Sequence, residues 1–240
     1  MNSLRVFIGY DSEEPVAYSV LAFSIMRHAK TPISITPLKL GQLPMTRKRA
    51  DYQSTEFSFS RFLVPYLCNY EGTAIFMDSD MLCKADLSEI EVDPYKAVSV
   101  VKHAYTPKDE EKFLGHRQSV YEKKNWSSFM YFNNAMCKTL TPKVVNDASG
   151  LYLHQFKWLQ DDSLIGEIPN QWNYLVGEGN QCNFEDAKVL HYTLGTPCFR
   201  KYKDCLGSKD WYETQDQMLY YNRFGEGLER EKSEIRASQG

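Results

Sequence analysis

Residues Thr73 to Asp80 read TAIFMDSD, and this stretch decides the fold class. Its first five residues are mostly apolar, which predicts a buried strand, and Asp78, Ser79 and Asp80 follow at once. Side chains two positions apart on an extended chain point to the same side. Both carboxylates are therefore able to bind one hard divalent cation, which prefers oxygen ligands and commonly keeps phosphate oxygens in its shell.

The residues ahead of this strand predict a β-α-β unit. Leu4 to Tyr10 is a short strand-like run, a helix is expected from Pro15 to Lys30, and Ile33 to Leu38 resembles a second strand. A parallel crossover needs such a helix, so we expect an α/β fold with a mainly parallel central sheet flanked by helices. Ligands of open α/β sheets bind outside the carboxyl ends of the strands, which is where Asp78 and Asp80 stand.

Further along the chain, hydrophobic periodicity predicts two more helices and three more strands. The helices are expected at Phe59 to Asn69 and Asp210 to Phe224, and the strands at Lys96 to Lys102, Ser128 to Phe132 and Ala187 to Tyr192. A length of 240 residues fits one large α/β domain. We expect residues 1–209 to form its body and residues 210–240 to add a C-terminal helix and a charged tail to the same domain.

Composition excludes several classes of function. A net charge of -3 gives no general attraction for nucleic acid or an anionic membrane, so a phosphate-bearing ligand needs a local cation. No apolar stretch approaches the roughly 20 residues that span a bilayer, so we expect no transmembrane segment and a cytoplasmic protein. The six cysteines form no C-x-x-C pair, which argues against a zinc site or a small disulfide framework.

Six short segments occur in an informative order. They are FIGYD (Phe7 to Asp11), SRFLVP (Ser60 to Pro65), DSD (Asp78 to Asp80), YFNNA (Tyr131 to Ala135), LQDDSL (Leu159 to Leu164) and LHYTLGTP (Leu190 to Pro197). In this order the chain resembles the GT-A glycosyltransferases, especially the glycogenin-like family 8, over about residues 4 to 200.

The resemblance implies a fold and a reaction. It implies the GT-A (Rossmann-like) nucleotide-sugar-binding fold and a metal-dependent glycosyltransferase. Such an enzyme moves a sugar from a nucleoside-diphosphate sugar, with a UDP-sugar favoured, to a hydroxyl of a carbohydrate or glycoconjugate acceptor. Retention of anomeric configuration and Mn²⁺ or Mg²⁺ as cofactor are expected from the same resemblance.

The metal ligands implied by the resemblance are Asp78, Asp80 and His191. Asp78 would also contact the donor ribose, and the imidazole of His191 suits a manganese-like ion. A D-x-D pair is expected about once by chance in a chain of this length. The alternative is that Asp78 caps a turn and Asp80 is solvated. A lone His at a strand end more often packs or caps, so the role of His191 depends on the match of LHYTLGTP.

The donor-binding residues implied by the resemblance come from both halves of the chain. Arg61 would donate to donor oxygens through its planar fork, with a helix-surface ion pair as the alternative. Asn133 would bind sugar hydroxyls, with a helix N-cap as the alternative. The other expected donor contacts are Gly9, Tyr10 and Asp11 around the base and ribose, and Lys201 or its neighbour Arg200 in place of a family lysine.

Asp161 and Asp162 are the candidate catalytic residues. They fall where the family carries a D-Q-D-like segment, and they would orient the sugar or stabilise developing positive charge. Asp161 stands where the family usually has Gln, so an inverting reaction with an aspartate as general base stays open. Helix-capping carboxylates are the alternative for this pair. Two further signals are Lys102 and His103, which close the strand after the metal loop, and the cluster Trp172 to Tyr174, which suits a sugar face. Strand-end charges and buried Trp are common without a ligand.

Two other functions compete with the glycosyltransferase interpretation. A haloacid-dehalogenase-like phosphatase also places D-x-D after an apolar strand, but it expects Thr or Val two residues later, where Leu82 stands, and its motif usually follows the first strand. A non-catalytic protein that binds nucleotide sugars would use the same pocket without turnover.

Overall fold

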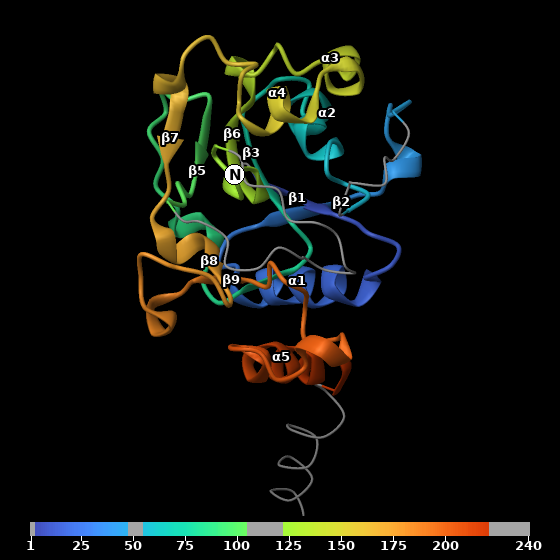
Figure 1. Cartoon of the computed structure of the whole chain (residues 1–240), viewed down its shortest axis with the longest axis vertical. Coiled ribbons are helices and arrows are strands. Elements are labelled where there is room, and N and C mark those ends of the chain that lie inside the picture. Colours follow the sequence, from blue (N-terminus) through green and yellow to red (C-terminus); the bar gives the residue numbers. More distant parts are fainter. Residues whose placement is uncertain (1–2, 48–54, 105–121, 221–240) are drawn as a thin grey trace, which may run out of the picture.

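The computed structural model describes residues 3–47, 55–104 and 122–220, which form two β-sheets with helices around them (Figure 1). The strands are β1 (Leu4–Gly9), β2 (Ile33–Leu38), β3 (Thr73–Met77), β4 (Met81–Cys83), β5 (Val98–Val100), β6 (Phe129–Asn133), β7 (Ile165–Glu167), β8 (Tyr174–Leu175) and β9 (Val189–His191). The α-helices are α1 (Pro15–His28), α2 (Val64–Leu67), α3 (Pro142–Asp147), α4 (Gly150–His154) and α5 (Ser208–Tyr220).

The six-stranded sheet has the order β2-β1-β3-β6-β5-β7. The directions of its strands determine which strand ends share an edge. β1 is parallel to β2 and β3, and β5 is parallel to β7, whereas β6 runs antiparallel to both β3 and β5. The expected mainly parallel α/β sheet is confirmed. The carboxyl ends of β1, β3 and β5 therefore lie at one edge of the sheet, together with the amino end of β6.

Alternation along the strands divides the core between the two faces of this sheet. Val6 and Ile8 pack with Leu21 and Ile25 of α1, which presents its apolar side to the sheet. Phe7 lies on the other face in a second cluster that includes residues of α2 and α4. Burying each such side chain contributes about 1.5–3 kcal/mol, so both faces hold the edge of the sheet firmly in place.

A second, three-stranded sheet was not expected from the sequence. The strand predicted at Ala187 to Tyr192 is the shorter β9, and it pairs with β4 and β8 in the order β4-β9-β8. β4 and β8 have three and two residues, too short for a periodic signal. The helix predicted at Phe59 to Asn69 is also broken, into a 3-10 turn at Ser60–Leu63 and the four-residue α2.

The C-terminal helix α5 packs on α1, as Figure 1 shows below the sheet. Trp211 is fully buried in a cluster with Val20 of α1 and Tyr192, which follows β9. The proposed division at residues 209/210 falls in the first turn of α5, and the predicted tail lies outside the described residues. Within the described ranges, none of the helices has the length and apolar character that crossing a membrane requires.

Candidate functional site

Asp78, Asp80 and His191 come together next to the carboxyl end of β3. Asp78 follows β3, Asp80 precedes β4, and His191 is the last residue of β9. The antiparallel pairing of β4 with β9 sets His191 opposite Met81, and the backbone N–H of Tyr192 donates to the carbonyl of Asp80 at 2.8 Å. One ligand atom from each of the three residues lies within 4.8 Å of the other two. The predicted trio thus forms one cluster.

The ring of His191 is oriented by a chain of buried hydrogen bonds. Its Nδ1 lies 2.9 Å from Oδ1 of Asn173, whose Nδ2 donates to Ser128 Oγ at 2.9 Å. Ser128 Oγ in turn donates to the carbonyl of Asn125 at 2.6 Å, so it must accept from Asn173, and this fixes the orientation of the amide. Nδ1 of His191 is then a protonated nitrogen, and Nε2 is the ring atom that faces the carboxylate of Asp80.

This donor set fits a divalent cation. Nε2 of His191 lies 3.3 Å from Oδ1 of Asp80, and the carboxylate of Asp78 completes the group. Two carboxylates and a neutral imidazole suit Mn²⁺, and also Mg²⁺ with water and phosphate oxygens in the remaining positions. At protein metal sites the ligating imidazole usually donates its other N–H to an oxygen acceptor, and Oδ1 of Asn173 is such an acceptor here.

Arg61 is buried against Asp78. Its Nη1 lies 2.9 Å from Oδ1 of Asp78, and the two side chains are only 7% and 14% exposed. The guanidinium also donates to the carbonyl of Ser127 at 3.0 Å and lies 5.0 Å from the ring of Phe76. Arg61 is therefore not the helix-surface ion pair that was the alternative. It holds Asp78 in place at the edge of the sheet.

Gly9 ends β1, and Tyr10 and Asp11 follow it at the same edge, because Ile8 of β1 pairs with Met77 of β3. A Cβ on Gly9 would lie 2.3 Å from the Phe57 ring, so only glycine fits here. The buried carboxylate of Asp11 accepts the backbone N–H groups of residues 13 and 56 at 3.0 and 3.1 Å. The segment Gly9–Asp11, which was expected to contact the nucleotide sugar, therefore lies at the same edge as the cluster.

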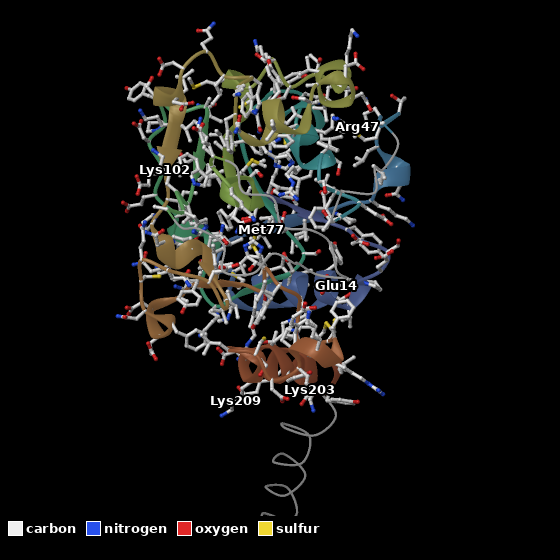
Figure 2. All side chains as sticks on the ribbon, in the orientation of Figure 1. Glu14, Arg47, Met77, Lys102, Lys203 and Lys209 are labelled. Carbon is white, nitrogen blue, oxygen red and sulfur yellow. The ribbon has the colours of Figure 1, made fainter. Side chains whose placement is uncertain are left out.

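Glu14 is an acidic residue of this edge that sequence reasoning did not single out. It lies just ahead of α1 and is 6% exposed (Figure 2). Burial, followed by the charges of Asp80 and Asp11, raises the pKa of its carboxyl to about 8. The hydroxyl of Thr196 donates to this carboxyl. The only signal in the sequence was an acidic pair in front of Pro15, which also fits an ordinary helix start.

His103 lies at the carboxyl end of the predicted strand that contains β5. Burial, followed by the nearby His191, lowers the pKa of His103 to about 3. Its backbone carbonyl accepts the indole N–H of Trp126 at 3.1 Å. A neutral imidazole is therefore held close to the cluster.

Asn133 lies at the opposite edge of the sheet. It pairs with Thr73, the first residue of β3, and its amide donates to the carbonyl of Pro94 at 3.0 Å. Because β6 is antiparallel to β3, the start of β6 and not its end adjoins Asp78. The backbone N–H of Asp78 donates to the carbonyl of Ser128 at 2.9 Å. The segment Asn125–Ser128 takes the place at the site that was expected for Asn133.

Asp161 and Asp162 also lie outside the cluster. The carboxylate of Asp161 accepts the N–H of Ser163 at 2.6 Å and caps a 3-10 turn, as in the capping alternative, and this hydrogen bond lowers its pKa. Asp162 is 71% exposed and pairs with Lys123 at 2.6 Å. The next turn residue, Leu164, accepts the N–H of residue 97 at the amino end of β5. The backbone of both residues thus precedes β7 at the amino end of that strand.

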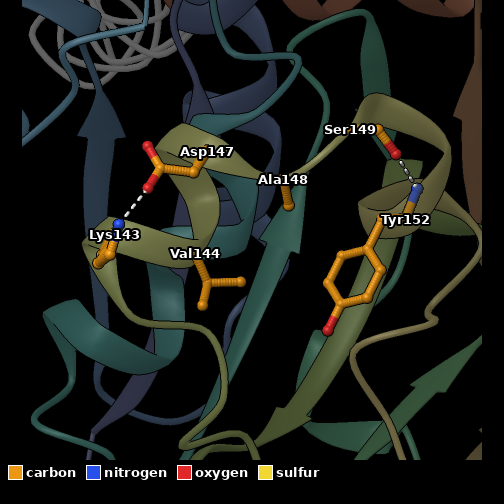
Figure 3. A pocket seen from close by; sticks show the side chains of 6 residues that line it. All are labelled: Lys143, Val144, Asp147, Ala148, Ser149 and Tyr152. Atoms are coloured by element: carbon orange, nitrogen blue, oxygen red, sulfur yellow. Dashed lines mark hydrogen bonds and ion pairs between the residues drawn. The ribbon is translucent and has the colours of Figure 1, made fainter.

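Lys201 is exposed in the turn Arg200–Tyr202, with its Nζ 5.3 Å from the ring of Tyr202. The hollow lies between α3 and α4, and Figure 3 shows the side chains around it. It is lined by Lys143, Val144, Asp147, Ala148, Ser149 and Tyr152, none of which the sequence had suggested as a site residue.

Comparison with solved structures identifies the fold. The WbbM bifunctional glycosyltransferase matches 92% of this chain with a TM-score of 0.59 and 17% identity, and GlyE of Streptococcus pneumoniae TIGR4 matches 90% with 0.60 and 13%. The galactosyltransferase LgtC matches 89% with 0.51 and 10%. The chain spans 51% of the WbbM chain, 60% of the GlyE chain and 96% of the LgtC chain. At these identities the likeness shows the fold, which is the GT-A fold.

Sequence comparison gives a much closer relative. No family model matches the chain. Protein CDI of Arabidopsis thaliana is 41% identical over 230 residues, which are 91% of this chain and 87% of that protein. An identity of this size over nearly the whole of both chains shows common ancestry and a common fold. The chain belongs to the family of Protein CDI.

Proposed function

We propose that this chain is a metal-dependent glycosyltransferase that moves a sugar from a nucleoside-diphosphate sugar to an acceptor hydroxyl. One observation carries the proposal: Asp78, Asp80 and His191 converge at the carboxyl edge of a GT-A sheet. The fold is shared with three proteins named as glycosyltransferases. The same edge also holds Arg61 and the segment Gly9–Asp11, where a nucleotide would lie across the ends of β1 and β3.

The proposed cofactor is Mn²⁺, with Mg²⁺ as the alternative, held by Asp78, Asp80 and His191. When bound, such a cation offsets the negative charge that develops on a departing diphosphate. Asn173 keeps Nε2 of His191 available, and Arg61 fixes the carboxylate of Asp78. The protein supplies a rigid set of ligands, because each of these partners is itself buried and hydrogen-bonded.

Donor and acceptor are proposed from the resemblance to family 8 together with the geometry of this edge. We expect a UDP-sugar, with Tyr10 and Asp11 beside the nucleoside, and a carbohydrate or glycoconjugate acceptor. Membership of family 8 and a cytoplasmic location are also predictions. Lys201 is proposed as a contact of the diphosphate, and its side chain would extend to it from an exposed turn. Asn133 has no place in this proposal, because it lies at the other edge.

The proposed stereochemical course is retention. The inverting alternative relied on Asp161 or Asp162 as general base, and neither belongs to the metal cluster. Their turn-capping and ion-pair contacts favour the structural alternative for both residues. Proton NMR of the first-formed product decides the course: a product with the anomeric configuration of the donor is expected, and the opposite configuration would reject retention.

A thermal-shift screen of nucleoside diphosphates, each with and without Mn²⁺, tests the function. A ligand present at roughly 100 times its Kd stabilises the folded state by about 2.7 kcal/mol. We expect a shift in the melting temperature with uridine diphosphate only when Mn²⁺ is present. Equal shifts with and without the metal, for every nucleotide, would contradict a metal-mediated donor site.

The competing functions are separated by product analysis. The phosphatase alternative loses support because the fold is GT-A and the D-x-D segment follows the third strand of the chain. Release of inorganic phosphate from a sugar phosphate would restore it. A non-catalytic binding protein would bind the nucleotide with Mn²⁺ but release no nucleoside diphosphate from any nucleotide sugar.

A further inference from the structure

The side chain of Glu14 is directed away from the helix that it precedes. A polar residue at this position commonly accepts an N–H group from the first turn of its helix. The carboxyl of Glu14 makes no such bond to α1. It accepts instead the hydroxyl of Thr196, a fully buried residue 182 positions away in the sequence. The buried carboxyl therefore ties the start of α1 to a distant segment.

That segment, residues 192–199, begins immediately after His191. Its first residue, Tyr192, donates its backbone N–H to the carbonyl of Asp80 at 2.8 Å. Gly195 has φ 141°, and a Cβ on it would lie 2.3 Å from the ring of Tyr202, so the chain turns tightly here. The carbonyl of Pro197 accepts the hydroxyl of Tyr212 in α5 at 2.6 Å. The segment is thus attached to the metal cluster at one end and to α5 at the other.

The surroundings of Glu14 favour a neutral carboxyl. The carboxylates of Asp80 and Asp11 both raise its pKa, as burial does to a larger extent. The groups that lower it are the hydroxyl of Thr196 and the thiol of Cys198, which lies 3.9 Å from Oε1. A protonated Glu14 accepts from Thr196 without adding a further negative charge to this edge. Glutamine has the same shape and the same acceptor, so it is the matched replacement.

We propose that Glu14 is a positioning residue whose hydrogen bond to Thr196 holds residues 192–199 against α1 and so sets His191 and the Arg200–Lys201 pair relative to the donor. The effect on donor binding rests on the proposed function, whereas the anchoring of residues 192–199 by Glu14 does not depend on it. His191 lies directly before the segment and Arg200 directly after it. A shift of the segment therefore moves an imidazole of the metal cluster and two cations together.

Four variants of the full chain test the proposal. Glu14→Ala removes the acceptor, Thr196→Val removes the donor with little change of shape, and Glu14→Gln restores the acceptor. Glu13→Gln changes the exposed neighbouring carboxylate and is the control. Hydrogen exchange of residues 192–199 is measured by mass spectrometry without any ligand, and the affinity for uridine diphosphate with Mn²⁺ is measured by calorimetry.

The expected pattern separates positioning from general destabilisation. Glu14→Ala and Thr196→Val should each speed exchange of residues 192–199 and weaken nucleotide affinity by roughly tenfold, the size expected for a lost hydrogen bond to a buried group. Glu14→Gln and Glu13→Gln should match the wild type in both measurements. If Glu14→Ala does not fold, Thr196→Val decides the exchange result alone.

Two results would overturn the proposal: wild-type exchange in Thr196→Val, or a Glu14→Gln variant as impaired as Glu14→Ala. A wild-type protein that binds neither uridine nor guanosine diphosphate with Mn²⁺ would instead reject the proposed function. In that case the exchange data would still decide whether Glu14 anchors the segment.

Discussion

The two edges of the central sheet carry acidic and amide side chains of different character. At the carboxyl edge, Asp78 is buried in an ion pair with Arg61 and belongs to a cluster of converging ligand atoms. At the amino edge, Asp162 is exposed, and Asn133 is bonded to a backbone carbonyl. The direction of a strand, more than the residue types beside it, therefore decides which polar residues form a site.

The ion pairs of the two edges should differ most in their effect on stability. Arg61→Met leaves the carboxylate of Asp78 buried without its cation, and should lower the free energy of unfolding by about 3–5 kcal/mol. Asp162→Asn removes the charge of an exposed group and should cost about 0–1 kcal/mol. Urea unfolding of both variants measures this, and equal losses would show that burial of the Arg61 pair has been misjudged.

The carboxyl edge should also impose a distinctive pH dependence through Glu14. Its pKa of about 8 in the folded protein lies above the usual 4.5, so the folded state keeps a proton that the unfolded chain has lost. The contribution of Glu14 to the free energy of unfolding is therefore complete below about pH 4.5 and falls as pH rises towards 8, by up to about 1.4 kcal/mol per pH unit. Glu14→Gln should remove this fall in metal-free protein.

Glu13→Gln is the control for this measurement, because Glu13 is exposed. The difference in unfolding free energy between Glu14→Gln and wild type should grow from pH 5 to pH 8, while Glu13→Gln shows no such growth. Parallel curves for Glu14→Gln and wild type would mean that Glu14 is ionised in the folded protein at neutral pH.

Replacing one asparagine at each edge should affect Mn²⁺ affinity differently. Asn173→Ala leaves Nδ1 of His191 without its acceptor, and should weaken Mn²⁺ affinity by roughly 10–100-fold. Asn133→Ala, at the other edge, should leave that affinity unchanged. Electron paramagnetic resonance of free Mn²⁺ gives both values, and a loss of affinity in Asn133→Ala alone would reverse the assignment of the edges.

The smallest effect is expected at Asp161. Its carboxylate caps a surface turn, and an asparagine keeps a side-chain oxygen that accepts the same N–H group, so this change should leave the turn intact. Asp161→Asn should therefore change the rate of sugar transfer by no more than about twofold. A loss of several hundredfold in kcat would return Asp161 to the catalytic role that the sequence motif suggested.

Sequence reasoning succeeded where function is tied to the end of a clearly apolar strand. TAIFM is periodic and buried, so the position of Asp78 and Asp80 followed from it, and the motif with His191 supplied the third member of the cluster. The β-α-β start was equally readable, because Pro15 and the spacing of apolar residues mark α1.

The remaining features depend on contacts between distant segments. Asn133 was misplaced because a strand-like pattern does not tell whether the strand runs with or against its neighbour. The burial of Glu14 requires Thr196, and the orientation of His191 requires Asn173 and Ser128. The strands β4 and β8 are too short to show a period and form only by pairing with β9.

In the proposed function, a cation held by the carboxyl edge recruits the nucleoside diphosphate. Calorimetric titration with uridine diphosphate, with and without Mn²⁺, tests it in the wild type and in the double variant Asp78→Asn, Asp80→Asn, which keeps the shape of both side chains. We predict metal-dependent binding in the wild type and none in the double variant. Undiminished, Mn²⁺-dependent affinity in the double variant would contradict the claim.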